Sequence, residues 1–182
     1  MKTIINLLLF CGISILAKGQ DILISKNAAL SFFSSTVVED IEANSTTASS
    51  VLDIKSRNII FRVNNNSFQF KKKMMQEHFN ENYMESDKYP YSEFKGKITD
   101  DVDLSKDGTY TVNVSGSLNV HGVTKPYQTK ATITVGSGVT TAKATFRVRI
   151  EDHKIKIPSI VFKNIAEFVD VRVSATYQPK KP

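Results

Sequence analysis

The chain has 182 residues, which limits it to one domain or at most two. Its 24 Lys and Arg exceed its 18 Asp and Glu, which gives a formal net charge of +6. This excess is too small and too dispersed to indicate a nucleic-acid-binding protein, and a single Cys excludes an intrachain disulfide framework.

The first 19 residues have the pattern of a secretory signal peptide. Lys2 precedes an apolar run over residues 4–16, and Ala17 and Gly19 place small residues where a signal peptidase cuts. The run is short for a membrane span of about 20 residues, although a retained membrane anchor is the alternative interpretation. We expect residues 1–19 to be removed and residues 20–182 to form one exported domain. The only Cys leaves with the signal, so packing alone must stabilise the domain.

The N-terminal part of this domain predicts short strands. Apolar runs at residues 22–24, 30–33 and 37–42 predict two or three of them, and the polar stretch 44–50 predicts a turn. We therefore expect a broken, irregular start to the sheet.

A hairpin and a helix are predicted next. Residues 51–54 and 59–63 flank a short turn at 56–58, as in a β-hairpin. The apolar side chains change parity across 64–67, which predicts a bulge or local bend within a strand that continues to residue 70. Residues 74–83 have helical spacing, with one face formed by Met75, His78, Phe79 and Asn82.

The second half alternates apolar and polar residues in the manner of an antiparallel meander. Strands are predicted around 94–98, 110–120 and 127–135, and Gly122 and Pro126 mark a hairpin corner between the last two. We expect Pro126 to end one ladder before the next begins. Further strands are predicted at 142–150 and 169–177, and the apolar segment 155–162 predicts a covering segment because Pro158 forbids a central strand. About eight to ten strands with one or two short helices indicate an all-β antiparallel barrel or sandwich.

The sequence predicts neither a metal site nor a nucleophilic active site, so no cofactor is expected. His78, His121 and His153 lie far apart without metal-ligand spacing, and there is no Gly-x-Ser-x-Gly motif. The acidic residues at 100–103 lack a calcium-loop pattern and are expected to form a solvated turn. His121 and Gly122 are expected to form a corner, not a catalytic pair.

On each predicted strand the apolar side chains fall on one face, and we expect these faces to line one common interior. A small barrel interior either fills with side chains or holds one small ligand, and the pattern alone favours the filled core. Met74, Met75 and Phe79 favour the other interpretation, because flexible thioethers suit the opening of an adaptable apolar site.

Two motifs resemble the YceI-like family. The stretch GSLNVHGVTKP at residues 116–126 is similar to the family's strand-turn signature, and FNENYMESDKYPYSEF at 79–94 is similar to its short helix followed by a strand. A weaker similarity lies in LSFFSS at 30–35 and EDIEA at 39–43. Gln76 and Glu77 stand where the family often has an Arg-Asp pair, so a head-group contact by that pair is not expected here.

The resemblance implies an extended eight-stranded antiparallel lipocalin-like β-barrel that encloses an apolar tunnel. It implies a non-enzymatic, periplasmic or secreted protein of the bacterial envelope that sequesters or carries a long-chain lipid, such as a polyisoprenoid or a quinone. No nucleic-acid partner and no membrane segment after signal cleavage are expected. The expected ligand-binding residues are Phe61, Val63, Phe68, Phe70, Met74, Met75, His78, Phe79, Val112, Val114, Leu118, Val120, Ile133, Phe146, Val148, Ile160 and Phe162.

Two other functions remain open at this point. The barrel could be a scaffold whose loops, such as 44–50 or 100–108, meet a protein partner in a stress-related or adhesion role. An enzyme acting on a lipid would need an inward polar group, for which His78, Tyr83 and Arg147 are the candidates. The long strands are also compatible with a homodimer.

Overall fold

The strands of this protein form one closed antiparallel barrel. The structure is a computed structural model that describes residues 21–35, 40–156 and 167–179. The strands are β1 (Ile22–Ser35), β2 (Asp40–Asp53), β3 (Asn58–Asn64), β4 (Gln69–Phe70), β5 (Tyr91–Ile98), β6 (Gly108–Val120), β7 (Val123–Gly136), β8 (Val139–Arg149) and β9 (Phe168–Pro179). Their order is β1-β9-β8-β7-β6-β5-β3-β2-β4, and β1 also pairs with β2, which closes eight strands and leaves the short β4 as an extension. The predicted eight-stranded barrel is confirmed.

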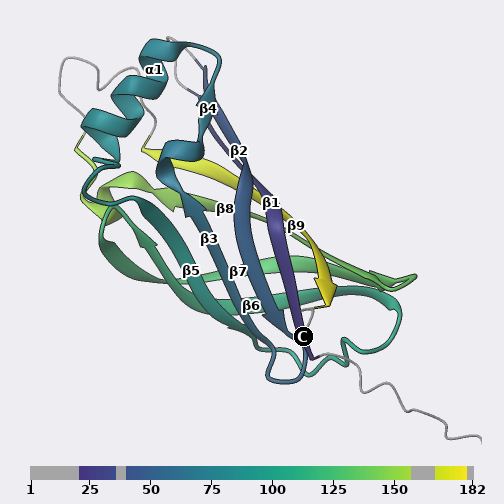
Figure 1. Cartoon of the computed structure of the whole chain (residues 1–182). Helices are drawn as coiled ribbons and strands as arrows, with labels where there is room; N and C mark the ends of the chain where they lie inside the picture. The colour runs from purple at the N-terminus through teal and green to yellow at the C-terminus, as the bar shows by residue number, and fades with distance from the viewer. Residues whose placement is uncertain (1–20, 36–39, 157–166, 180–182) are drawn as a thin grey trace, which may run out of the picture.

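Short helices lie at one end of the barrel, which we call the helix end (Figure 1). They are the 3-10 helix η1 (Asn65–Ser67), α1 (Lys73–His78) and the π-helical turn η2 (Phe79–Tyr83); a further 3-10 helix, η3 (Ile150–His153), follows β8. The predicted helix at 74–83 is therefore confirmed, although its second half is π-helical. Among the described residues, no helix has the length and hydropathy needed to cross a membrane.

The opposite end of the barrel is filled by side chains, and we call it the packed end. Five of its large side chains are at most 1% exposed, namely Leu52, Ile98, Val112, Ile133 and Tyr177. The Tyr177 hydroxyl lies 2.7 Å from Ser50 Oγ, and burial raises the pKa of Tyr177 to about 12. Apolar side chains from β2, β5, β6, β7 and β9 thus close the interior at this end.

The N-terminal strands differ from the sequence-based expectation. β1 is one strand of 14 residues, because register shifts on either side of Ala28 absorb its irregular pattern. The predicted turn at 44–50 is wrong, since β2 runs through it with Ser45, Ala48 and Ser50 buried. Serines there face inward and their hydroxyls are hydrogen-bonded, so the segment looks polar while it lines the core. Residues 37–39 of the predicted run 37–42 lie outside the described residues.

The prediction that one strand continues through 64–67 with only a bulge or local bend is also wrong. β3 ends at Asn64, whose side-chain oxygen accepts a hydrogen bond from the Asn66 backbone N–H at 2.9 Å and starts η1. The parity of the apolar residues changes because the chain leaves the sheet for one helical turn before β4.

Both predicted hairpin turns are present. At the first, Asp53 Oδ1 accepts the backbone N–H groups of Lys55 and Ser56. At the second, His121 and Gly122 have φ of 50° and 71°, as a two-residue turn with two positive φ values requires.

Pro126 does not end a ladder as expected. It lies within β7 and pairs with Ser117 on β6, at a position where β7 has no pairing with β8. The hydrogen bond that a proline cannot donate is therefore not needed at this point.

Candidate functional site

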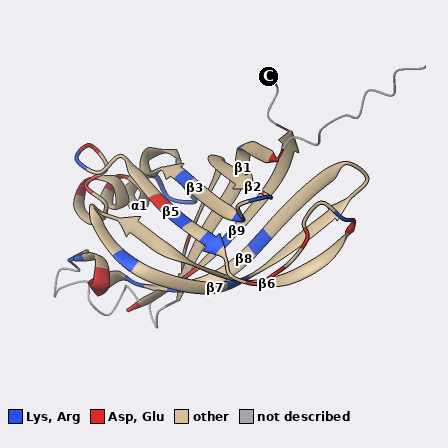
Figure 2. Cartoon of the chain, turned by 90° about the horizontal axis from the view of Figure 1, so that it is seen from below, with Lys and Arg blue, Asp and Glu red and all other residues tan. Residues whose placement is uncertain are grey.

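A cavity of about 390 Å³ occupies the helix end of the barrel. Strand side chains such as Leu118 and Val148 form its walls, and Met75 and Phe79 from α1 and η2 cover it. None of its described lining residues is Lys, Arg, Asp or Glu. Figure 2 shows Lys, Arg, Asp and Glu interspersed over the strands and loops.

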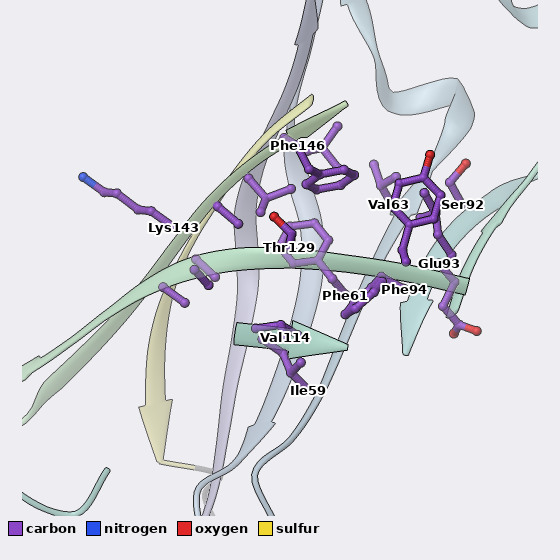
Figure 3. A pocket seen from close by; sticks show the side chains of 18 of the residues that line it. Ile59, Phe61, Val63, Ser92, Glu93, Phe94, Val114, Thr129, Lys143 and Phe146 are labelled. Carbon is purple, nitrogen blue, oxygen red and sulfur yellow. The ribbon is translucent and has the colours of Figure 1, made fainter. Parts of the chain in front are cut away.

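A second, smaller space of about 90 Å³, which we call the branch, lies next to this cavity and closer to the packed end. The two spaces share five lining residues, which are Leu30, Val63, Ser92, Leu118 and Phe146. Figure 3 shows Phe146 pointing into the branch and the Lys143 ammonium pointing away from it. The two spaces are therefore adjacent, and we call them together the tunnel.

Most of the residues predicted to bind ligand line the tunnel. Those at the large cavity are Val63, Phe68, Phe70, Met74, Met75, His78, Phe79, Leu118, Val120, Phe146 and Val148, and the branch adds Phe61 and Val114. Val112 and Ile133 line neither space, because they are buried in the packed end, and we leave them out of the proposed site. Ile160 and Phe162 lie outside the described residues, together with most of the expected covering segment.

Four phenylalanines build the helix end of the tunnel. Phe79 contacts Phe32, Phe68 and Phe70 with ring-centroid distances of 5.5, 5.5 and 5.1 Å. The π-helical turn that begins at Phe79 brings both Phe79 and Tyr83 to the cavity. Phe32 was missed in the list of expected residues, although it belongs to the apolar run 30–33 that predicts a strand.

The few polar groups at the cavity are mostly satisfied within the protein. The Asn65 side chain is fully buried, donates to the Tyr89 carbonyl at 2.6 Å and accepts from Ser92 Oγ at 2.8 Å. Tyr83 lines the cavity, and burial raises the pKa of its hydroxyl. Arg147, the third candidate for an inward polar group, lines neither space and pairs with Asp170 at 2.9 Å.

The corner at His121 ties three segments together at the helix end. His121 Nε2 lies 2.7 Å from Glu85 Oε2, and its Nδ1 lies 3.2 Å from the His153 carbonyl oxygen. The hydrogen bond from His121 is the main reason that the pKa of the Glu85 carboxyl is lowered. His153 is fully buried, its Nδ1 lies 3.0 Å from the Val123 carbonyl oxygen, and burial lowers its pKa. These contacts assign His121 a structural place beside the cavity.

The described residues contain no group of three or more His, Cys, Asp or Glu placed to hold a metal ion. The three acidic residues of the 100–103 turn instead have separate partners. Asp100 accepts from Asn113, Asp101 pairs with Arg57, and Asp103 accepts from Ser105, which lowers the pKa of Asp103 to about 2.

Comparison with known proteins identifies the family of this barrel. The model of the YceI-like domain matches residues 23–177. The chain belongs to the YceI-like family. No curated protein matches the sequence.

Solved structures share the YceI-like fold at low sequence identity. A polyisoprenoid binding domain from Saccharophagus degradans, implicated in plant cell wall breakdown, has a TM-score of 0.74 at 15% identity, covering 88% of this chain and 99% of that one. BcnA of Burkholderia cenocepacia has a TM-score of 0.69 at 15% identity, with 82% and 95% covered. The YceI protein of Campylobacter jejuni has a TM-score of 0.64 at 15% identity, with 81% and 90% covered.

Proposed function

We propose that this chain is an exported, non-enzymatic lipid-binding protein that sequesters or carries a long apolar chain in its tunnel. The ligand class is a polyisoprenoid, an isoprenoid quinone or a similar amphiphile. The observation that carries the proposal is the mainly apolar lining of two adjacent spaces inside the barrel, the larger of which has no charged residue in its described lining. The polyisoprenoid binding of the Saccharophagus degradans domain supports the same ligand class.

The energetics favour a long flexible chain over a small polar molecule. Burying a methylene group stabilises the complex by about 0.8 kcal/mol. Ten methylenes then contribute about 8 kcal/mol, which reaches the range of association costs of about 4–15 kcal/mol. A charged head group would lose its hydration inside this cavity without gaining an ionic partner, so we place the head group at the helix end, near solvent.

The signal-peptide pattern supports export, and we propose a periplasmic or secreted location. The mainly apolar lining of the large cavity supports binding over catalysis. A homodimer stays a prediction that light scattering of the purified protein can test.

The test is direct identification of co-purified lipid. The protein is purified without detergent and extracted with organic solvent, and the extract is analysed by mass spectrometry; we expect a near-stoichiometric long-chain lipid. Val120→Asp places a charge in the cavity and should reduce the bound lipid at least about tenfold. Asn119→Asp adds the same charge at the neighbouring residue, which does not line the tunnel, and should leave the bound lipid unchanged.

An empty wild-type extract, with no uptake of added prenols or fatty alcohols, would contradict the proposal and favour the scaffold alternative. Equal loss of lipid in both variants would show that the charge acts through general destabilisation, and it too would contradict the assignment of the tunnel.

A further inference from the structure

The barrel wall between β7 and β8 is only partly hydrogen-bonded. The register of these strands runs from Gly136–Val139 to Ala131–Ala144 and extends no further. β7 nevertheless continues to Val123 in full pairing with β6, and β8 continues to Arg149 in full pairing with β9. Residues 123–130 and 145–149 therefore face each other without a backbone ladder, and we call this part of the wall the seam.

Side chains take the place of the ladder across the seam. The rings of Tyr127 and Phe146 meet edge to face with centroids 6.1 Å apart. Thr129 Oγ1 lies 3.5 Å from the Thr145 carbonyl oxygen, at the limit of a hydrogen bond. η3 packs against the corner end of the seam, where His153 Nδ1 lies 3.0 Å from the Val123 carbonyl oxygen and its ring lies 6.2 Å from the ring of Tyr127. Opening the rest of this wall requires breaking side-chain contacts, whereas opening a fully paired wall requires breaking a row of backbone hydrogen bonds.

The narrow branch of the tunnel lies directly behind the seam. Its lining includes Tyr127, Thr129 and Ala131 from β7, and Ala144 and Phe146 from β8. The branch therefore ends against the one stretch of this wall that has no ladder.

The packed end blocks a long chain in the direction of the far hairpins. Ile98, Val112 and Ile133 are at most 1% exposed and fill the barrel beyond the branch. A chain that enters from the helix end meets these side chains before it can reach the far hairpins. The seam borders the branch and has no backbone ladder, so it offers a continuation for the end of the chain.

We propose that the seam is a lateral opening through which the end of a long apolar chain leaves the barrel. This inference rests on the proposed function and narrows its ligand class to chains longer than the tunnel. The methylenes that extend out through the seam have the same surroundings as they have in the unbound ligand. They therefore neither add to the affinity nor reduce it. Affinity thus reaches a plateau with chain length, whereas a sealed tunnel would reject the longest chains.

The experiment closes the seam with a removable cross-link. The two cysteines are introduced by Gln128→Cys on β7 and Arg147→Cys on β8. These positions are opposite each other when the Ala131–Ala144 register is extended into the seam, and both native side chains are exposed. The full chain also carries Cys11→Ser, and a bis-methanethiosulfonate reagent with a two-carbon spacer joins the two thiols. The same reagent on Thr111→Cys and Thr132→Cys joins a fully paired position of β6 and β7 as a matched control.

Each protein exchanges with an equal mixture of 15-carbon and 55-carbon prenols in octyl glucoside micelles. Detergent is then removed, and mass spectrometry of the extract gives the bound ratio of long to short prenol. We expect the seam cross-link to lower this ratio at least tenfold, the unlinked variant and the control cross-link to keep the wild-type ratio, and reduction to restore it.

The outcomes separate this inference from the proposed function. If wild type binds neither prenol, the proposed function fails. If it binds both and the seam cross-link leaves the ratio unchanged, only the lateral opening is overturned. An equal loss of both prenols also overturns it, because the cross-link then deforms the cavity as a whole.

Discussion

Val112 and Val120 lie on the same strand with the same inward parity, yet they have different surroundings. Val112 is 1% exposed in the packed end, whereas Val120 lines the large cavity. Replacing each by Ala removes two methyl groups, worth about 1.6 kcal/mol of burial when the site is fully packed. At Val112 the new void adds to this loss, so Val112→Ala should cost about 2–3 kcal/mol. Val120→Ala only enlarges an existing space and should cost about 1 kcal/mol or less.

Thermal unfolding followed by far-UV circular dichroism measures this difference. For a domain of this size, each kcal/mol shifts Tm by about 2–4 °C, so Val112→Ala should lower Tm by about 4–12 °C and Val120→Ala by less than about 4 °C. Ligand binding should show the reverse order, with prenol affinity reduced up to about tenfold in Val120→Ala and unchanged in Val112→Ala. Equal Tm losses would refute the reasoning, since Val120 would then be packed as tightly as Val112.

Three further predictions concern the barrel wall and the corner. Gly116→Ala should cost at least about 1–3 kcal/mol in urea unfolding, because its Cβ would meet the backbone of β5, whereas Gly136→Ala, with open space around it, should be nearly neutral. Tyr177→Phe should cost about 1 kcal/mol in the same assay, because the buried hydroxyl loses its hydrogen bond; an unchanged midpoint would contradict this. The lowered pKa of Glu85 means that its contribution to stability is present above the ordinary value of 4.5 and is lost as pH falls through the folded value. Glu85→Gln should therefore lower Tm at pH 7 and leave it nearly unchanged at pH 2, and a loss of equal size at both pH values would contradict the pairing with His121.

The sequence predicts the second half of the barrel well because its walls alternate. Strands β5 to β9 carry apolar residues at every second position, and the two-residue turn at His121 and Gly122 separates two of them. β1 and β2 are harder, since Ser45, Ala48 and Ser50 fill inward positions. Small and hydroxylated residues at the core give no hydrophobic alternation, although their hydroxyls are hydrogen-bonded there.

The extent of the cavity could not be predicted from alternation alone. Val112 and Val120 have the same residue type and parity, and only the side chains that reach them from other strands decide which one is packed. Ile133 was expected at the ligand for the same reason. The family resemblance indicates a tunnel, but the structure determines that the tunnel stops at Ile98 and Ile133.

One half of the barrel interior is packed and the other half is hollow, so the two halves should respond differently to mutation. Substitutions in the packed end act on folding, because each side chain there is enclosed on all sides. Substitutions around the cavity change the shape of an existing space and leave most of the folding energy intact. Under the proposed function, ligand preference can therefore change by point mutation in this barrel without passing through unstable intermediates, and the residues that line both parts of the tunnel, such as Leu118 and Phe146, are the positions at which to test this.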